Sequence, residues 1–212
     1  MIIILYLMLN LFLNQTSLDI YYPDFDNIRL ICGSTAPDND NITFCCAGAF
    51  TGSKLETFDH SNIAGNHISN GKLYKGYDCP INTGVFIWDN NCWKFLLGDL
   101  TLGLGESVNS NRMGFAQNMI IYNNVKQPLW RHNIRYYRSL CELNGKLCII
   151  QSSRPMFYRT YVHKLEKLGV KHALYLDMGS WKHALYKTNN TIVHINESIH
   201  PYYTNWIVFE NS

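Results

Sequence analysis

A β-hairpin pattern at residues 135–151 constrains the fold of this chain more than any other feature. Asn144-Gly145 separates two apolar runs there, and this dipeptide is typical of the type I′ turn in a two-residue hairpin. Directly opposed residues pair across such a turn, so the register predicts that Arg138 lies opposite Gln151. The sequence therefore predicts a hairpin with an arginine near its open end.

The segment after this hairpin predicts a helix and then another strand. Ser153 is a candidate N-cap, and Pro155 lies near the first helical position. Apolar residues recur with helical spacing over 157–168, and Gly169 is a typical helix stop. Residues 170–176 predict a strand, so the unit is βαβ, with two parallel strands and a right-handed crossover.

Both strands of a βαβ unit end at the same edge of the sheet. We therefore expect Asp177 to lie near Ser152, Ser153 and Arg138. The helix start would offer unpaired N–H groups and the positive end of its dipole to an anion. A cation, an anion-binding helix start and a carboxylate together suit acid/base cleavage of a phosphate ester. A structural interpretation stays open, in which the aspartate caps a turn, the serines start a helix and the arginine pairs with an acid.

The rest of the chain predicts further strands and few helices. Strands are expected at residues 28–32 and 42–50, and hairpins are expected at Asn90-Asn91 and Asn123-Asn124, whereas residues 59–84 resemble a loop. The predicted fold class is α+β, a mixed and strand-rich sheet with a C-terminal hairpin and a βαβ unit. A length of 212 residues without a linker predicts one domain at 18–212.

Net charge and the N-terminal segment limit which partners and which cellular location we expect. A formal net charge of +2 without a Lys/Arg block argues against a nucleic-acid partner. Residues 1–17 form an apolar leader too short to span a bilayer, so no membrane span is expected in the mature chain. The leader has the length of a signal-peptide core but lacks a basic start, which leaves a mis-assigned start codon or a buried first strand as alternatives. We expect export to the periplasm or cell envelope, with a cytoplasmic location as the alternative.

The seven cysteines give no metal signature. No Cys-x-x-Cys pair occurs, so a structural zinc site is not expected. No metal and no other cofactor is part of the prediction. Cys141 and Cys148 face each other in the predicted hairpin, within disulfide reach. Packing as two free thiols in the core is the equally acceptable alternative.

These residues resemble a known family. The run from Arg138 to Gly179 is similar to the C-terminal half of the phosphodiester glycosidase domain, the family of the mannose 6-phosphate uncovering enzyme and of bacterial exopolysaccharide-related proteins. The resemblance extends over residues 42–186, and residues 46–52 (CAGAFTG) are similar to the family's Asn-Gly-Gly-Phe-Phe stretch. Further stretches resemble a subgroup from Bacteroides-like bacteria. The resemblance implies the family's fold and a sugar-phosphate substrate.

The family's glycine-rich loop after the aspartate is altered in this chain. The family pattern Asp-Gly-Gly-Gly-Ser is replaced by Asp177-Met178-Gly179-Ser180-Trp181, and Cys46 stands where the family has an asparagine. Glycines there would let backbone amides approach a phosphate, so Met178 narrows or redirects the loop. The resemblance therefore supports the fold more strongly than the activity.

Other polar and aromatic residues are candidate substrate contacts. His60, Asn62 and His67 are interpreted as lining the mouth of a pocket, although ordinary loop hydrogen bonding also explains them. Asn82 is a candidate contact or a turn residue, and Trp181 is a sugar-stacking or a core residue.

The leading hypothesis is a hydrolase of phosphodiester-linked or related sugar conjugates, which needs no cofactor. Asp177 would be the general acid/base or nucleophile, and Arg138 with Ser152 and Ser153 would hold the phosphate, beside Gly179. The alternative is a non-catalytic glycan-binding or envelope polysaccharide-associated protein on the same scaffold.

Overall fold

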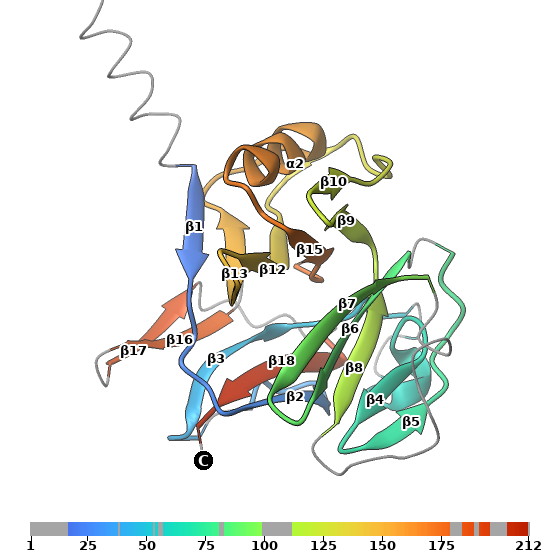
Figure 1. The fold of residues 1–212 in the computed structure, drawn as a ribbon. Helices are drawn as coiled ribbons and strands as arrows, with labels where there is room; N and C mark the ends of the chain where they lie inside the picture. The colour runs from blue at the N-terminus through green and yellow to red at the C-terminus, as the bar shows by residue number, and fades with distance from the viewer. Residues whose placement is uncertain are drawn as a thin grey trace, which may run out of the picture.

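The computed structural model describes residues 17–37, 39–52, 54, 57–80, 83–98, 112–178, 184–188, 191–195 and 203–211. Within these residues, strands dominate and form three main sheets around a shared core, together with one α-helix and one short 3-10 helix (Figure 1). The predicted strand-rich α+β class is confirmed.

The six-stranded sheet contains the predicted hairpin. Its order is β1 (Leu18–Tyr21), β13 (Lys146–Ser152), β12 (Arg138–Leu143), β15 (His172–Tyr175), β9 (Met119–Tyr122) and β10 (Val125–Lys126). The hairpin register is as predicted, with Arg138 opposite Gln151 and Cys141 opposite Cys148. Both thiols are free and buried, so they pack in the core.

The predicted parallel direction of the two strands in the βαβ unit is confirmed, but the helix between them begins later than predicted. β13 and β15 both run antiparallel to β12, so they are parallel to each other, with β12 between them. Helix α2 (Tyr158–Lys167) covers the outer face of this sheet (Figure 1) and is capped at Phe157 without a side-chain hydrogen bond. The predicted N-cap at Ser153 is therefore wrong. Directly before the helix, the chain is extended because β14 (Met156–Phe157) pairs with β11 (Ile134–Arg135).

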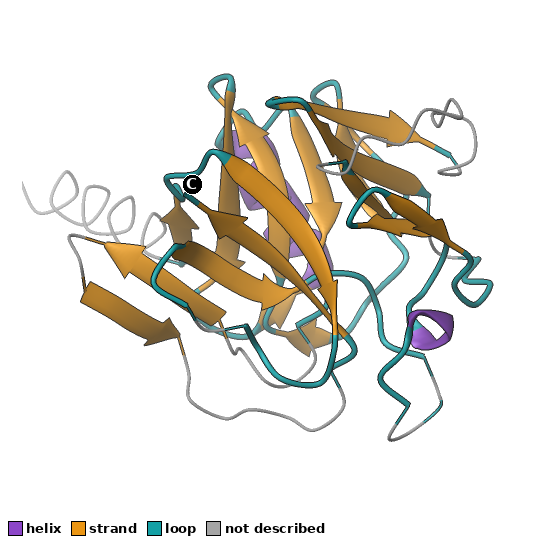
Figure 2. Ribbon diagram, turned by 90° about the horizontal axis from the view of Figure 1, so that it is seen from below, coloured by secondary structure: helices purple, strands orange, loops and turns teal. Residues whose placement is uncertain are grey.

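The five-stranded sheet beneath it joins both ends of the chain. Its order is β17 (Thr191–Ile195), β16 (Ala184–Thr188), β3 (Ile42–Ala47), β18 (Asn205–Glu210) and β2 (Asn27–Cys32). Figure 2 shows this sheet in front of the helix, with the six-stranded sheet between them.

The second five-stranded sheet lies beside these two layers. Its order is β5 (Lys72–Tyr74), β4 (His67–Ser69), β8 (Met113–Gln117), β6 (Gly84–Asp89) and β7 (Cys92–Leu97). β4 and β5 correct the prediction that residues 59–84 form a loop; within it, η1 (His60–Asn62) precedes β4. The missed signal is Asn70-Gly71, whose positive φ angles of 50° and 69° make the hairpin turn.

The core lies between the three sheets. Phe44, Phe86, Leu140, Leu174 and Phe209 are fully buried there. A second apolar cluster packs helix α2 on the opposite face of the six-stranded sheet. Among the described residues, no helix has the length and apolar content to cross a membrane.

Candidate functional site

The structure places Asp177, Ser152 and Arg138 at the same end of the six-stranded sheet. Arg138 pairs with Gln151 on β13, next to Ser152. On its other side, the Arg138 carbonyl accepts a hydrogen bond from the Leu176 N–H at 3.0 Å, directly before Asp177. The backbone therefore brings the predicted carboxylate and cation to neighbouring strands.

The carboxylate of Asp177 is partly exposed and is fixed by the segment that follows β3. The backbone N–H of Asp177 donates to the Gly48 carbonyl at 2.8 Å. The N–H of Thr51 in turn donates to Oδ2 of Asp177 at 3.3 Å. Residues 48–52, which resemble the family's Asn-Gly-Gly-Phe-Phe stretch, therefore lie against the candidate catalytic aspartate.

The segment 48–52 is held from its other side by the start of β18. The buried side chain of Asn205 accepts from the Ala49 N–H at 2.8 Å and donates to the Ala49 carbonyl at 2.9 Å. A Cβ atom at Gly48 would approach Asn205 Oδ1 to 2.9 Å, so this close approach requires a glycine. Asp177 is thus held by the 48–52 segment, and the two bonds from Asn205 to Ala49 form a clamp that fixes this segment from its other side.

Replacement of Asn205 tests this clamp. We expect Asn205→Ala to lower the free energy of unfolding by about 2 kcal/mol, because the buried N–H and C=O of Ala49 lose their partners. Urea denaturation measures the loss, and the exposed residue Asn41 provides the control Asn41→Ala. Equal stability of Asn205→Ala and the wild type would contradict the clamp.

Three further side chains, those of Tyr77, Thr204 and Tyr203, lie around Asp177 and the Thr51 segment that holds it. The hydroxyl of Tyr77 donates to the Thr51 carbonyl at 3.2 Å, and the hydroxyls of Thr51 and Thr204 lie 3.1 Å apart. The buried phenol of Tyr203 has a raised pKa, caused first by burial; the charge of Arg138 lowers it and the charge of Asp177 raises it. Tyr203 therefore lies within electrostatic reach of both proposed catalytic residues.

Arg138 is fully buried between the sheets. Its Nε and Nη2 atoms donate to Oε1 of Gln151 at 2.9 and 2.6 Å. The thiol of Cys46 lies beside it; burial raises the pKa of Cys46 to about 11, and the charge and hydrogen bond of Arg138 act in the opposite direction. Asp19 pairs with Gln151 from β1, so Asp19, Gln151 and Arg138 form one cross-strand row. In this conformation the guanidinium acts on the site through its charge and has no exposed surface.

The two serines have structural partners in the described structure. The Ser152 hydroxyl accepts a hydrogen bond from the Tyr137 N–H at 2.9 Å, and the Ser153 N–H donates to the Ser17 carbonyl at 3.1 Å. Because helix α2 begins only at Tyr158, its N-terminus does not adjoin the two serines as predicted.

Asn62 supports the loop beside the site. Its Nδ2 donates to the carbonyls of Lys54 and Thr57 at 2.7 and 2.8 Å, and its backbone carbonyl accepts from the Gly52 N–H. This buried side chain thus fixes the chain that continues from residues 48–52. The described contacts of Asn62 are therefore structural, because they all fix the backbone of this loop.

His60 and His67 form a coupled pair. The fully buried His67 contacts the Gly65 carbonyl through Nδ1 at 3.2 Å, and its Nε2 lies 2.8 Å from Nδ1 of His60. The ring of Tyr74 stacks on His60. If His67 Nδ1 carries the proton donated to Gly65, its Nε2 accepts from His60. The pair is thereby satisfied when both imidazoles are neutral.

Burial of His67 predicts a pH-dependent stability. Burial lowers the pKa of His67 to about 4, whereas an unfolded histidine titrates near 6.5. Between these two pKa values, His67 binds a proton in the unfolded state but not in the folded state. The free energy of unfolding therefore falls by roughly 2–3 kcal/mol as pH drops from about 6.5 to about 4. Urea denaturation of wild type and His67→Gln at several pH values measures this difference, with His163→Gln at an exposed site as the control. A difference between the two proteins that does not change with pH would contradict it.

Three predicted contact residues, Gly179, Asn82 and Trp181, lie outside the described residues. Within the described part of the chain, no group of three or more His, Cys, Asp and Glu side chains is placed to hold a metal ion.

Sequence reasoning missed several residues around Asp177. Thr51, Tyr77 and Asn205 reach the site from the other two layers or their connections. The available signal was the likeness of residues 46–52 to a family motif, since nothing local connects those residues to Asp177.

No family model matches this chain, and no curated protein matches its sequence. Its fold does match solved structures. One is the catalytic domain of zebrafish N-acetylglucosamine-1-phosphodiester alpha-N-acetylglucosaminidase, auto-inhibited by its pro-peptide. The superposition has a TM-score of 0.62 and 11% sequence identity, and it covers 92% of this chain and 83% of that chain.

At 11% identity, this match concerns the fold. The predicted resemblance to the phosphodiester glycosidase fold is confirmed to that extent. Membership of a Bacteroides-like subgroup stays a prediction.

Proposed function

We propose that this protein hydrolyses the glycosidic bond of a sugar-1-phosphodiester, with Asp177 as its catalytic carboxylate. The observation that carries the proposal is the partly exposed Asp177 carboxylate, held by the Thr51 N–H at the sheet end where Arg138 lies. A fold shared with a phosphodiester glycosidase catalytic domain over most of both chains supports the same reaction class.

The proposed reaction adds water across the bond between the anomeric carbon and the phosphate oxygen. Asp177 acts either as the base that deprotonates the water or as the nucleophile that the water later displaces. The leaving group is a phosphomonoester, whose second pKa is about 6, so it departs as an anion with little need of a proton. One carboxylate therefore suffices where an ordinary glycosidase uses two.

Arg138 favours an anionic substrate through its charge. A guanidinium in a low-dielectric interior interacts with a nearby phosphate more strongly than it would in water. Direct contact with substrate is assigned to candidates from the sequence, namely Gly179, Trp181, His60 and Asn82. Extracytoplasmic sugar conjugates are the proposed substrates, consistent with the expected export of the chain.

The test is an assay of sugar release by the purified full-length protein. An N-acetylglucosamine-1-phosphodiester is the first probe, because the structurally similar zebrafish enzyme is named for it. We expect free sugar and a phosphomonoester in equal amounts, and no release from the corresponding methyl glycoside, which lacks an anionic leaving group. Comparable cleavage of both compounds would contradict the role of the phosphate. Binding without cleavage would favour a glycan-binding protein.

A further inference from the structure

A polar cavity lies at the opposite end of β18 from Asp177. Its volume is about 550 Å³, within the range of about 300–1,000 Å³ found for small-molecule sites. Asn205, which holds the 48–52 segment against Asp177, begins β18, and Glu210, in the cavity, ends it. Five steps along the strand separate these two positions by about 17 Å. The cavity is therefore distinct from the proposed catalytic site.

The lining of this cavity combines amides with two carboxylates and an indole. The residues are Asp26, Asn27, Trp88, Asn90, Asn91, Glu210 and Asn211. No Lys, Arg or His lines it, so the cavity is unsuited to an anion such as phosphate. Each side-chain amide offers both donors and acceptors, as do the hydroxyl groups of a sugar. The composition of the lining therefore matches an uncharged polyhydroxylated ligand.

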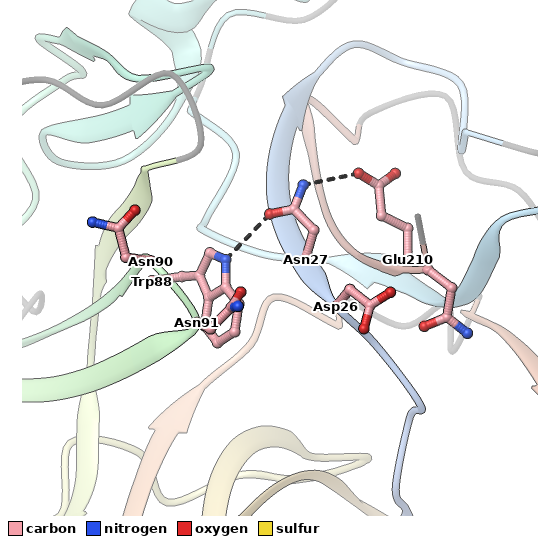
Figure 3. Close-up of a pocket in the computed structure, with 7 residues that line it drawn as sticks. Asp26, Asn27, Trp88, Asn90, Asn91 and Glu210 are labelled. Carbon is pink, nitrogen blue, oxygen red and sulfur yellow. Dashed lines mark hydrogen bonds between the residues drawn. The ribbon is translucent and has the colours of Figure 1, made fainter.

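Hydrogen bonds fix much of the lining in advance. Figure 3 shows Asn27 between the Trp88 indole and the Glu210 carboxylate, and dashed lines mark its bonds to both. The indole N–H donates to Asn27 Oδ1 at 3.2 Å, and Asn27 Nδ2 donates to Glu210 Oε1 at 3.1 Å. The other oxygen of Glu210 pairs with Arg29 at 2.6 Å. Because the charge of Glu210 is already balanced, a sugar is favoured over a metal cation as the occupant.

The turn between β6 and β7 supplies the opposite wall. Asn90 and Asn91 adopt positive φ angles of 49° and 60°, and both are exposed. The turn at Asn123 and Asn124 has almost the same geometry, with φ angles of 48° and 62°, and none of the described cavities includes it. The chain thus contains two Asn-Asn turns of the same geometry. One lines this cavity, and the other lines none of the described cavities.

We propose that this cavity is a second carbohydrate-binding site, for an uncharged pyranose unit. It goes beyond the proposed hydrolysis, since it needs neither Asp177 nor a phosphate. Asn90 and Asn91 provide hydrogen bonds from one wall, and Asn27 with Asp26 provides them from the other. A protein with both sites would hold a glycan chain at one point while its reducing-end phosphodiester is processed at another.

The test is NMR titration of the isotopically labelled full-length protein with neutral oligosaccharides of glucose, mannose and N-acetylglucosamine. We expect at least one to shift the Trp88 indole N–H and the side-chain amide signals, with a Kd of about 1 mM. Asn90→Gly with Asn91→Gly should weaken binding about tenfold, because two hydrogen-bonding amides are lost. Glycine retains the turn, so the thermal melt should not fall. Asn123→Gly with Asn124→Gly is the matched control and should bind as the wild type does.

Two further arms separate this site from a metal-dependent site and from the proposed catalytic site. Binding should be unchanged in EDTA, and unchanged in Asp177→Asn, which distinguishes the result from failure of the proposed hydrolysis. The proposal is overturned if none of the three sugars binds, if the Asn90/Asn91 variant binds as tightly as its control, or if binding requires added CaCl₂.

Discussion

Replacement of Asp177 by asparagine should reduce sugar release by about 10³-fold and leave the fold intact. The asparagine retains an oxygen that accepts the Thr51 N–H, and the backbone bond from residue 177 to Gly48 does not depend on the side chain. It cannot deprotonate water or attack an anomeric carbon. We therefore expect the loss in kcat and only a small change in Tm. Stopped assays with purified protein and thermal melts measure both.

Asp89 offers a matched control for this substitution. It is also an aspartate at the end of a strand, but this strand, β6, belongs to a different sheet from the one that Asp177 follows. Its carboxylate pairs with Arg112 at 3.6 Å. Asp89→Asn should retain full activity. If Asp177→Asn is as active as Asp89→Asn, then Asp177 takes no part in the chemistry and only holds the 48–52 segment.

Replacement of Gln151 by leucine should destabilise the protein by about 3 kcal/mol. The Arg138 guanidinium is fully buried and directs two N–H groups to Oε1 of Gln151, at 2.9 and 2.6 Å. Leucine has nearly the same volume but accepts no hydrogen bond, so these two donors lose their acceptor in a water-free setting. For a chain of this length, the expected fall in Tm is about 10 °C.

A second substitution at Gln151 identifies the cause of that loss. Gln151→Glu keeps an oxygen acceptor at the same distance and adds a charge opposite to that of Arg138, so it should retain most of the stability. Gln127, whose side-chain bond to Val125 is exposed, provides the surface control Gln127→Leu. If Gln151→Leu and Gln151→Glu lose equal stability, packing and not the bond to Arg138 determines the effect.

The sequence predicted the part of the site that depends on local structure. The Asn144-Gly145 turn determines the register of β12 and β13, which places Arg138 opposite Gln151. Crossover topology then brings Asp177 to the same end of the sheet, one strand away. Both inferences follow from turn chemistry and strand direction within about forty residues of chain, where few alternatives exist.

The remainder of the site depends on contacts between distant segments. Asn205 reaches Ala49 across 156 positions of the chain, and no periodicity or turn signal encodes that pairing. The burial of Arg138 also escaped prediction, because it results from stacking of the two sheets and not from the hairpin. The helix start was misplaced because Pro155 is equally compatible with the extended segment that pairs β14 with β11.

Hydrolysis in H₂¹⁸O tests the central claim most directly. If Asp177 directs water to the anomeric carbon, the carbon–oxygen bond breaks, and mass spectrometry of early products should find ¹⁸O in the sugar hydroxyl and none in the phosphomonoester. Incorporation of ¹⁸O into the phosphate would mean that the phosphorus–oxygen bond breaks instead. That result would contradict a glycosidase at this end of the sheet.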